Sequence, residues 1–171
     1  LSGSIIGKHL NHELNIVTLD EVDSTNSYAK ELALSGKRVN TAVLAEKQTG
    51  GRGRMGRPFF SPDKNGLYMS LLCYPQMNAE NAPIVTSFAA TATAKAIEKL
   101  YGCDVNIKWV NDIYLNGKKI CGILTEAGFD FESGNVDYLV IGIGINVNGT
   151  EFPRELENIM TSLEKETGIS V

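Results

Sequence analysis

Asn116-Gly117 is the feature that most limits how this chain can fold. It separates two short apolar, β-branched runs, at 112–115 and 118–126. Asn-Gly between such runs predicts a tight β-hairpin. A longer β-branched run follows at 136–147. Consecutive strands without helices between them exclude strict βαβ alternation, so we expect an α+β fold in which helices pack on a mixed, largely antiparallel sheet.

The other segments fit this pattern. Alternating or apolar runs predict further strands at 14–20, 41–46, 66–74 and 105–109. Capping residues, periodic apolar residues and closing glycines predict helices up to Leu34, over 83–100 and over 161–167. We expect the last helix to open with a capping box made by Thr161 and Glu164. The long helix is expected to bury a stripe formed by Ile84, Phe88, Ala92, Ile97 and Leu100.

The bulk properties are those of one globular domain. The chain has 171 residues and a formal net charge of -4, which argues against a general nucleic-acid binder. Three scattered cysteines predict reduced thiols in a cytoplasmic protein. Two histidines, His9 and His12, do not provide the cluster that a structural zinc site needs. No apolar run is long enough to span a bilayer and no signal peptide is visible, so we expect no membrane partner.

A glycine- and arginine-rich run occupies residues 47–57 and holds four cations and no acid. Its four glycines open the backbone, so we expect successive N–H groups to converge on an anion, most simply a phosphate. Arg52, Arg54 and Arg57 would fold over that anion. The alternatives are a flexible solvated loop or a patch for single-stranded RNA. Its position between two apolar strands favours the ligand site, because RNA-binding arginine-glycine segments usually lie in low-complexity tails.

The predicted hairpin brings polar residues together. Asn111 and Asp112 begin one arm, and Lys119 lies on the other arm at a similar distance from the turn. A Lys beside a carboxylate and an Asn can contact phosphate oxygens or a metal-bridged nucleotide. An exposed ion pair on a polar face is an equally good interpretation of these residues alone.

Gly142 and Gly144 stand inside the strand at 136–147. Each weakens a strand by roughly 0.5–1 kcal/mol, so a compensating reason is expected. Close approach of a ligand or another backbone is the usual reason, and a bulge or a packing accommodation is the alternative. Ser24-Thr25-Asn26 alone is typical of a helix N-cap. The sequence contains no Ser-His-Asp triad and no Walker A motif.

Five sequence blocks, taken together and in this order, form a specific pattern over most of the chain. They are Ser24-Thr25-Asn26, the run from Gln48 to Arg57, Lys108-Trp109-Val110-Asn111-Asp112, Lys119-Ile120-Cys121-Gly122-Ile123-Leu124 and Gly142-Ile143-Gly144-Ile145-Asn146. With these blocks the sequence resembles the catalytic domain of biotin protein ligases, which implies a class II aminoacyl-tRNA synthetase-like fold.

The resemblance implies a reaction in two steps. The carboxylate of biotin attacks the α-phosphate of ATP with the help of Mg²⁺, giving biotinyl-5′-AMP and pyrophosphate. The ε-amine of a lysine on a biotin carboxyl carrier domain then attacks this mixed anhydride.

The resemblance also implies the residues of the site. The catalytic cations are Lys119, Arg52 and Arg54, and Mg²⁺ is expected near Asp112. Biotin is assigned to Ser24, Thr25, Asn26, Gln48, Gly51, Arg52, Gly53, Arg54, Lys119 and Gly122. The nucleotide is assigned to Arg54, Arg57, Lys108, Asn111, Asp112, Gly142, Gly144 and Asn146.

The sequence departs from the family at Val110, where relatives usually carry Pro. Both ends of the chain look cut, so we expect residues 1–171 to be a catalytic domain without the small C-terminal β-domain and without the N-terminal DNA-binding domain of repressor-type members. No DNA binding is therefore expected of these residues. Homodimerisation through a sheet edge is common in the family, and nothing in this sequence decides it.

Three alternatives stay open from the sequence. A lipoate or octanoate transferase shares the fold, but such relatives lack the glycine-arginine run. A non-catalytic biotin or nucleotide sensor would keep the binding residues without the reaction. An RNA-binding domain is disfavoured by the acidic charge and by the lack of an aromatic platform.

Overall fold

The computed structural model describes residues 14–171, which form one seven-stranded sheet with the strand order β1-β2-β3-β7-β6-β5-β4. The outer strands β1 and β2 are parallel, and every other neighbouring pair is antiparallel. The predicted mixed, largely antiparallel sheet is thus confirmed. The strands are β1 (Asn15–Val22), β2 (Thr41–Gln48), β3 (Gly66–Cys73), β4 (Asn106–Lys108), β5 (Asp112–Leu115), β6 (Lys118–Phe129) and β7 (Val136–Asn146).

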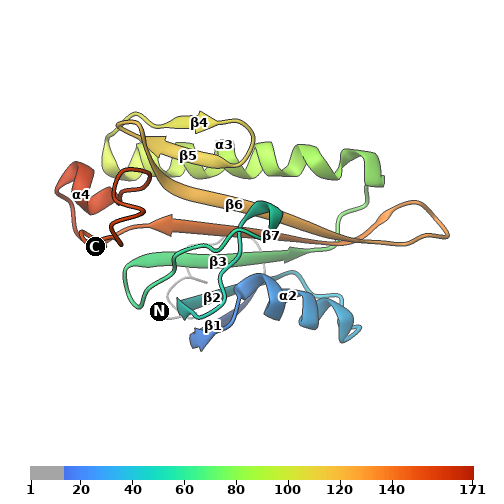
Figure 1. The fold of residues 1–171 in the computed structure, drawn as a ribbon. Coiled ribbons are helices and arrows are strands. Elements are labelled where there is room, and N and C mark those ends of the chain that lie inside the picture. Colours follow the sequence, from blue (N-terminus) through green and yellow to red (C-terminus); the bar gives the residue numbers. More distant parts are fainter. Residues whose placement is uncertain (1–13) are drawn as a thin grey trace.

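Helices pack on both faces of this sheet. They are α2 (Thr25–Leu34), α3 (Ala82–Tyr101) and the short α4 (Leu163–Thr167), with single 3₁₀ turns η1 (Arg54–Gly56) and η2 (Ala79–Asn81). In Figure 1, α3 runs along the β4–β6 side and α2 along the β1–β3 side. Ile143 of β7 belongs to the core under α3, whereas Val140, whose side chain points to the other face of the same strand, packs with α2. Because strand side chains alternate, the two helices cover opposite faces.

The expected buried stripe of α3 is wrong except at Ile97. Ile84, Phe88 and Leu100 are 53%, 65% and 76% exposed, and the buried face consists of small residues, chiefly Ala90 and Ala94, together with Ile97. Alanine lets the helix approach the β-branched surface of β6 and β7 closely. The large side chains therefore lie on the outer face of α3.

The hairpin at Asn116-Gly117 is confirmed, with positive φ of 50° and 79° at its two turn residues. The capping box expected from Thr161 and Glu164 is wrong, because the helix begins one residue later and the N3 position is then Lys165. Ser162 is the N-cap of α4, and its side chain accepts a hydrogen bond from the Lys165 N–H. The Thr161 hydroxyl instead donates to Glu166 at 2.7 Å.

The remaining sequence expectations concern thiols and membranes. Cys73, Cys103 and Cys121 are all free, as predicted. Cys121 is fully buried, and burial raises the pKa of its thiol to about 12. Within residues 14–171, no helix is both long and apolar enough to cross a membrane. His9 and His12 lie outside the described residues.

Candidate functional site

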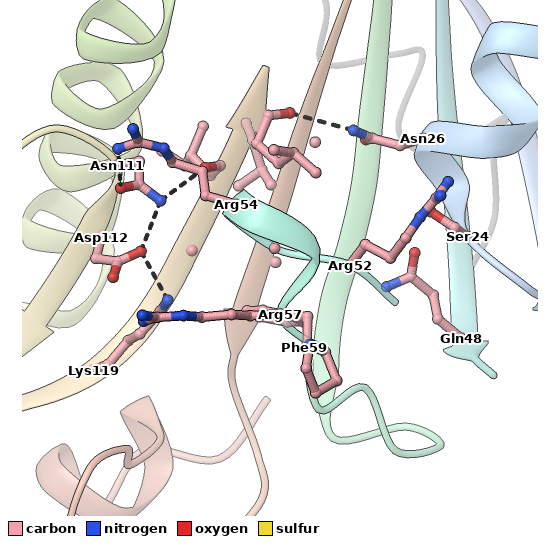
Figure 2. Close-up of a pocket in the computed structure, with 18 of the residues that line it drawn as sticks. Ser24, Asn26, Gln48, Arg52, Arg54, Arg57, Phe59, Asn111, Asp112 and Lys119 are labelled. Atoms are coloured by element: carbon pink, nitrogen blue, oxygen red, sulfur yellow. Dashed lines mark hydrogen bonds and ion pairs between the residues drawn. The ribbon is translucent and has the colours of Figure 1, made fainter. Parts of the chain in front are cut away.

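A cavity of about 410 Å³ lies on the α2 face of the sheet and gathers most of the residues singled out in the sequence. Figure 2 shows Asn111, Asp112 and Lys119 on one side of it, and Ser24, Gln48 and Arg52 on the other. The expected residues that line it are Ser24, Thr25, Asn26, Gln48, Arg52, Gly53, Arg54, Arg57, Asn111, Asp112, Lys119, Gly122, Gly142 and Gly144.

Strand alternation explains why three glycines share this face. Gly122 of β6 lies opposite Gly144 of β7, and Gly142 lies opposite Ser70 of β3. Because side chains alternate with a period of two, all four residues point away from the α3 core. Their small size leaves room above the middle of the sheet, and the cavity occupies that room.

The glycines of β7 also make space for protein side chains. A Cβ on Gly142 would lie 2.2 Å from Asn26 Oδ1, and a Cβ on Gly144 would lie 2.5 Å from the Phe59 ring. Close approach was the expected reason for glycine here, and the structure gives two groups of the chain itself that approach. Phe59 and Asn26 thereby pack directly on the sheet inside the cavity.

The polar end of the cavity is built at the start of α2. Gln48 Oε1 accepts hydrogen bonds from the Thr25 backbone N–H (2.8 Å) and hydroxyl (3.1 Å). Gln48 Nε2 in turn donates to Ser61 Oγ at 3.0 Å. Ser24 occupies the N-cap position predicted from the sequence, but its side chain makes no capping hydrogen bond. Its hydroxyl, in a residue only 3% exposed, therefore lines the cavity without serving the helix.

Asn26 is held by a buried polar network. Its Oδ1 accepts from Ser70 Oγ at 2.6 Å, and its Nδ2 donates to Glu126 Oε2 at 2.8 Å. Glu126 also pairs with Lys30 at 2.8 Å. Burial opposes ionisation of Glu126, but the hydrogen bonds from Lys30 and Asn26 and the nearby positive charges outweigh it, so the pKa lies below its usual value. The network ties α2 to β3 and β6.

A β-bulge aims Lys119 into the cavity. On β5 the partners Ile113 and Tyr114 are adjacent, but on β6 their partners Cys121 and Lys119 are separated by Ile120. The extra residue reverses the alternation, so Lys119 lies on the same face as Gly122 although the numbering alone places it on the other.

The positive end of the cavity has an internal counter-ion. Lys119 Nζ lies 2.7 Å from Asp112 Oδ1, which confirms the proximity predicted from the hairpin. Asn111 Nδ2 donates to the same carboxylate oxygen at 3.0 Å, and Arg54 donates to Asn111 Oδ1 at 3.4 Å. The peptide bond between Trp109 and Val110, just before these residues, is cis. Lys119 thus pairs with the one carboxylate and Arg54 contacts only the neutral Asn111 amide, so this end of the cavity keeps net positive charge for an anion.

The glycine-arginine run is itself a small hairpin around η1. The N–H groups of Gly53 and Phe59 donate to the carbonyls of Arg57 (2.7 Å) and Gly51 (2.9 Å), and Gly50 N–H donates to Asp23 O at 2.7 Å. These amides are therefore used within the chain, and the expected convergence of backbone N–H groups on an anion is wrong for them. The exposed arginine side chains carry the positive charge instead.

Three expected residues do not line the cavity. Gly51 is buried beneath it, where a Cβ would lie 2.6 Å from Ser61 Oγ. Lys108 is exposed on β4, with Nζ 5.4 Å from the centroid of the Tyr114 ring. Asn146 is 5% exposed and donates to the Thr161 carbonyl at 3.0 Å.

Sequence reasoning missed several residues of the site. Phe59 lies in the cavity with its ring 5.9 Å from Lys119 Nζ. Ser70 is fully buried beneath Thr25 and Asn26, and a polar residue inside the apolar run of β3 was the signal that could have found it. The cavity is also lined by three residues with no local signal, Leu156, Ile159 and Met160.

Metal ligands are sparse in this cavity. Within the described part of the chain, no group of three or more His, Cys, Asp or Glu residues could hold a metal ion. Asp112 is a carboxylate at the positive end, paired with Lys119. Such a site suits an ion that arrives with phosphate ligands rather than one held by protein alone.

The sequence matches known proteins over most of its length. The bifunctional ligase/repressor BirA of Bacillus subtilis is 42% identical over 170 residues, which cover 98% of this chain and 50% of that protein. The biotin–[acetyl-CoA-carboxylase] ligase of Paracoccus denitrificans is 38% identical over 90% of this chain and 64% of its own. The chain thus spans about half to two thirds of these relatives.

Solved structures of biotin protein ligases have a similar fold. The biotin protein ligase of Aquifex aeolicus in complex with biotin and ATP has a TM-score of 0.73 and 37% identity, covering 92% of this chain and 62% of that one. The Leishmania major enzyme with biotinyl-5-AMP has a TM-score of 0.74 and 31% identity, over 90% of this chain and 65% of that one. These matches confirm the class II aminoacyl-tRNA synthetase-like fold. Residues 19–146 also match the model of the biotin/lipoate A/B protein ligase family, to which this chain therefore belongs.

Proposed function

We propose that this domain activates biotin with ATP to form biotinyl-5′-AMP and transfers the biotinyl group to a lysine of a biotin carboxyl carrier domain. The observation that carries the proposal is one cavity with hydroxyl and amide groups of Thr25 and Gln48 at one end and the ammonium group of Lys119 at the other. Biotin has the same order of groups, with a polar ureido ring at one end and a carboxylate at the other.

The polar end suits the ureido ring. A cyclic urea carries two N–H donors and one carbonyl acceptor, and Ser24 and Thr25 offer hydroxyls there beside the Gln48 amide. Phe59, Met69 and Leu124 supply apolar surface for the second ring and the aliphatic chain. We assign biotin to these residues together with Asn26, Gly51, Gly53 and Gly122. Asn26 and Gly51 would act indirectly, because Asn26 bonds to Ser70 and Gly51 leaves room for Ser61, and both thereby hold the lining of the cavity in place.

The cationic end suits the reacting groups. When the biotin carboxylate attacks the α-phosphorus, negative charge grows on the phosphoryl oxygens and pyrophosphate leaves. Lys119 and Arg54 at this end would stabilise that charge, because fixed cations act more strongly in a site that excludes water. Arg52 lies on the opposite side of the cavity, where it donates a hydrogen bond to Ser27 Oγ at 2.6 Å. It would reach the same charge when the glycine-arginine run closes over the reacting groups.

The nucleotide would extend past Lys119 along the edge of the cavity. We assign it to Arg54, Arg57, Asn111 and Asp112 from their position, and to Lys108, Gly142, Gly144 and Asn146 from the resemblance. Asp112 and Asn111 fit a Mg²⁺ ion that arrives with ATP, because such ions take one or two carboxylates and complete their shell with phosphates and water. Bound there, the ion would neutralise phosphate charge.

The second step needs protection of the intermediate. An acyl adenylate hydrolyses readily, so the hairpin at 51–59 would close over it until the acceptor lysine enters. The neutral ε-amine then attacks the acyl carbon, the bond to the phosphate oxygen breaks, and AMP leaves. The cations that stabilised the first transition state also stabilise the departing phosphate. The free cysteines fit the cytoplasmic location that we propose for this reaction.

Pyrophosphate exchange into ATP tests the proposal. Radiolabelled pyrophosphate is incubated with the domain and ATP, with biotin, with lipoate, or with no acid. We expect exchange with biotin alone. Exchange that depends on lipoate would identify the other branch of the family, and biotin binding without exchange would identify a sensor. Lys119→Ala should reduce exchange by roughly 100-fold or more, as loss of a single transition-state contact does in other enzymes.

A further inference from the structure

A series of hydrogen bonds connects the partly exposed ion pair of Lys30 and Glu126 to the polar end of the cavity. Its contacts run from Glu126 to Asn26 (2.8 Å), then to Ser70 (2.6 Å) and then to Thr25 (2.7 Å). Thr25 and Asn26 line the cavity on the side of Gln48, whereas Ser70 is 0% exposed and lies beneath them. This series of four residues, from Glu126 to Thr25, is called here the relay.

The carboxylate of Glu126 sets the direction of the first hydrogen bond. Burial opposes its ionisation, but the hydrogen bonds from Lys30 and Asn26 outweigh this effect, lower its pKa and leave it ionised at neutral pH. An ionised carboxylate only accepts hydrogen bonds, so Asn26 must turn its Nδ2 toward Glu126. The same Nδ2 donates to the Leu124 carbonyl at 3.3 Å, which is also a pure acceptor. The Asn26 amide is thereby fixed with Oδ1 toward Ser70.

The two hydroxyl groups of the relay then have one consistent arrangement of protons, since each has a single proton to donate. Ser70 must donate to Asn26 Oδ1, because two oxygens 2.6 Å apart repel each other without a proton between them. The Ser70 oxygen, 2.7 Å from Thr25 Oγ1, is left to accept, so the Thr25 hydroxyl points its proton into the wall of the cavity. Gln48 Oε1, at 3.1 Å, is the other acceptor for that proton. Thr25 therefore offers a ligand only lone pairs.

We infer that Glu126 and Ser70 are specificity-determining positioning residues, which fix the Thr25 hydroxyl as a hydrogen-bond acceptor for an N–H group of the ligand. The inference rests on the proposed function for the identity of that ligand, since the ureido ring of biotin carries two N–H groups. A ring oxygen at the same place would meet the Thr25 oxygen with no proton between them. A site built around one hydrogen bond rejects an analogue that lacks the partner, because a buried polar group is then left unpaired.

Two analogues of biotin, in each of which one ureido N–H is replaced by a ring oxygen, test this inference. These cyclic carbamates keep the size of biotin, its carbonyl group and its carboxylate. The affinities of biotin and of both analogues are measured by calorimetry without ATP. We expect the parent protein to bind at least one analogue roughly 10- to 100-fold more weakly than biotin. Equal affinities for all three compounds would overturn the inference.

Ser70→Ala should weaken this discrimination. Thr25 loses an acceptor inside the wall, so its hydroxyl can turn and donate to a ring oxygen. We expect the affinity ratio between biotin and the weaker analogue to fall by roughly tenfold, whereas a loss of structure alone would lower both affinities alike. Ser162→Ala is the matched control, because it removes another fully buried serine hydroxyl from a residue that does not line the cavity. A ratio that Ser70→Ala leaves unchanged would overturn the inference.

Glu126→Gln tests the origin of the relay. In the parent protein Lys30 binds one carboxylate oxygen of Glu126 and Asn26 binds the other. An amide has a single acceptor oxygen and the charge of Lys30 attracts it, so the new NH₂ group faces Asn26 and favours the reversed orientation of its amide. We expect a smaller loss of discrimination, roughly threefold, and its recovery when Glu126→Gln is combined with Lys30→Met. A loss that the second substitution does not restore would refute the role of Glu126.

Proton NMR gives a readout that needs no ligand. A hydroxyl proton donated inside a buried wall exchanges slowly with water, so the Thr25 hydroxyl should give a resolved signal in the parent protein and in Ser162→Ala but not in Ser70→Ala. Equal exchange rates in the parent protein and in Ser70→Ala would overturn the relay. A parent protein that does not bind biotin would instead refute the proposed function, and the NMR measurement would still decide about the relay.

Discussion

Lys119 and Asp112 face each other across a bulge, with Nζ and Oδ1 2.7 Å apart and side chains 21% and 23% exposed. The direct partner of Lys119 in the ladder is Tyr114, and the partner of Asp112 is Gly122. The ion pair therefore depends on the bulge and on the small size of Gly122. An incoming phosphate must compete with Asp112 for the ammonium group unless a second cation compensates the carboxylate.

Asp112→Asn tests whether Asp112 serves a metal-bound nucleotide or only competes with phosphate for Lys119, in which case its loss would raise the rate. The variant keeps the shape but removes the charge that balances Lys119 and that suits a phosphate-bound Mg²⁺. We expect adenylate formation to fall by roughly tenfold or more, with a weaker dependence on Mg²⁺ concentration, as for loss of a charged contact in a transition state. Biotin affinity without ATP, measured by calorimetry, should change little. Asp104→Asn, at an exposed position, is the control, and an unchanged Mg²⁺ dependence would contradict the assignment.

Gly142→Ala should destabilise the domain through Asn26. The new Cβ would lie 2.2 Å from Asn26 Oδ1, so the amide must move and lose its bonds to Ser70 and Glu126. We expect a loss of about 1–3 kcal/mol in the free energy of unfolding, typical of overpacking, measured by urea titration. Gly53→Ala is the control, since its nearest neighbour lies at an ordinary 3.5 Å. Equal unfolding free energies of the two variants would show that Asn26 can move away from a Cβ at position 142 without destabilising the domain.

The hairpin at 51–59 should be more protected when the site is filled. We expect amide exchange across residues 49–60 to slow when biotinyl-5′-AMP binds, because the arginines then gain an anionic partner. Exchange followed by mass spectrometry, with β3 as an internal reference, measures this change. Equal protection with and without the adenylate would mean that the hairpin does not act as a lid.

Glu126 should contribute to acid stability. Its pKa is lowered in the folded protein, so its contribution is present above the unfolded value of about 4.3 and is lost as the pH falls through the folded value. We expect the unfolding free energy of the parent to decline more steeply below about pH 4.3 than that of Glu126→Gln. Glu31→Gln, on the exposed side of α2, should leave the steep decline in place. Parallel curves for parent and Glu126→Gln would contradict the network.

The sequence predicted those parts of the structure that depend on local chemistry. Asn116-Gly117 specified its turn because two residues with positive φ are needed there. The α3 stripe was wrong because residue size does not tell which face meets a sheet, and a closely packed helix buries alanine. The face of the sheet to which the Lys119 side chain points could not be predicted either. It depends on a bulge at Ile120, which is seen only in the pairing register of β5 and β6.

The candidate site was predicted by the types and order of its residues rather than by geometry. Glycine at positions 142 and 144 indicated close approach, but which groups approach, Asn26 and Phe59, depends on packing between distant segments. Ser61 and Met160 belong to no recognisable sequence motif. They were found only because Ser61 accepts a hydrogen bond from Gln48 and Met160 lines the cavity. Nothing in the sequence linked Asn146 to a segment fifteen residues later.

The hydrogen bonds between Lys119 and residues 159–161 give this part of the fold an order of assembly during synthesis. Residues 24–126, which hold the polar end and the cations, leave the ribosome before residues 159–161 do. Until then the backbone groups of Lys119 lack the two partners that flank them in the finished fold. A nascent chain can therefore assemble the polar end early, but the backbone of Lys119 is fixed in place only when residues 159–161 have been made.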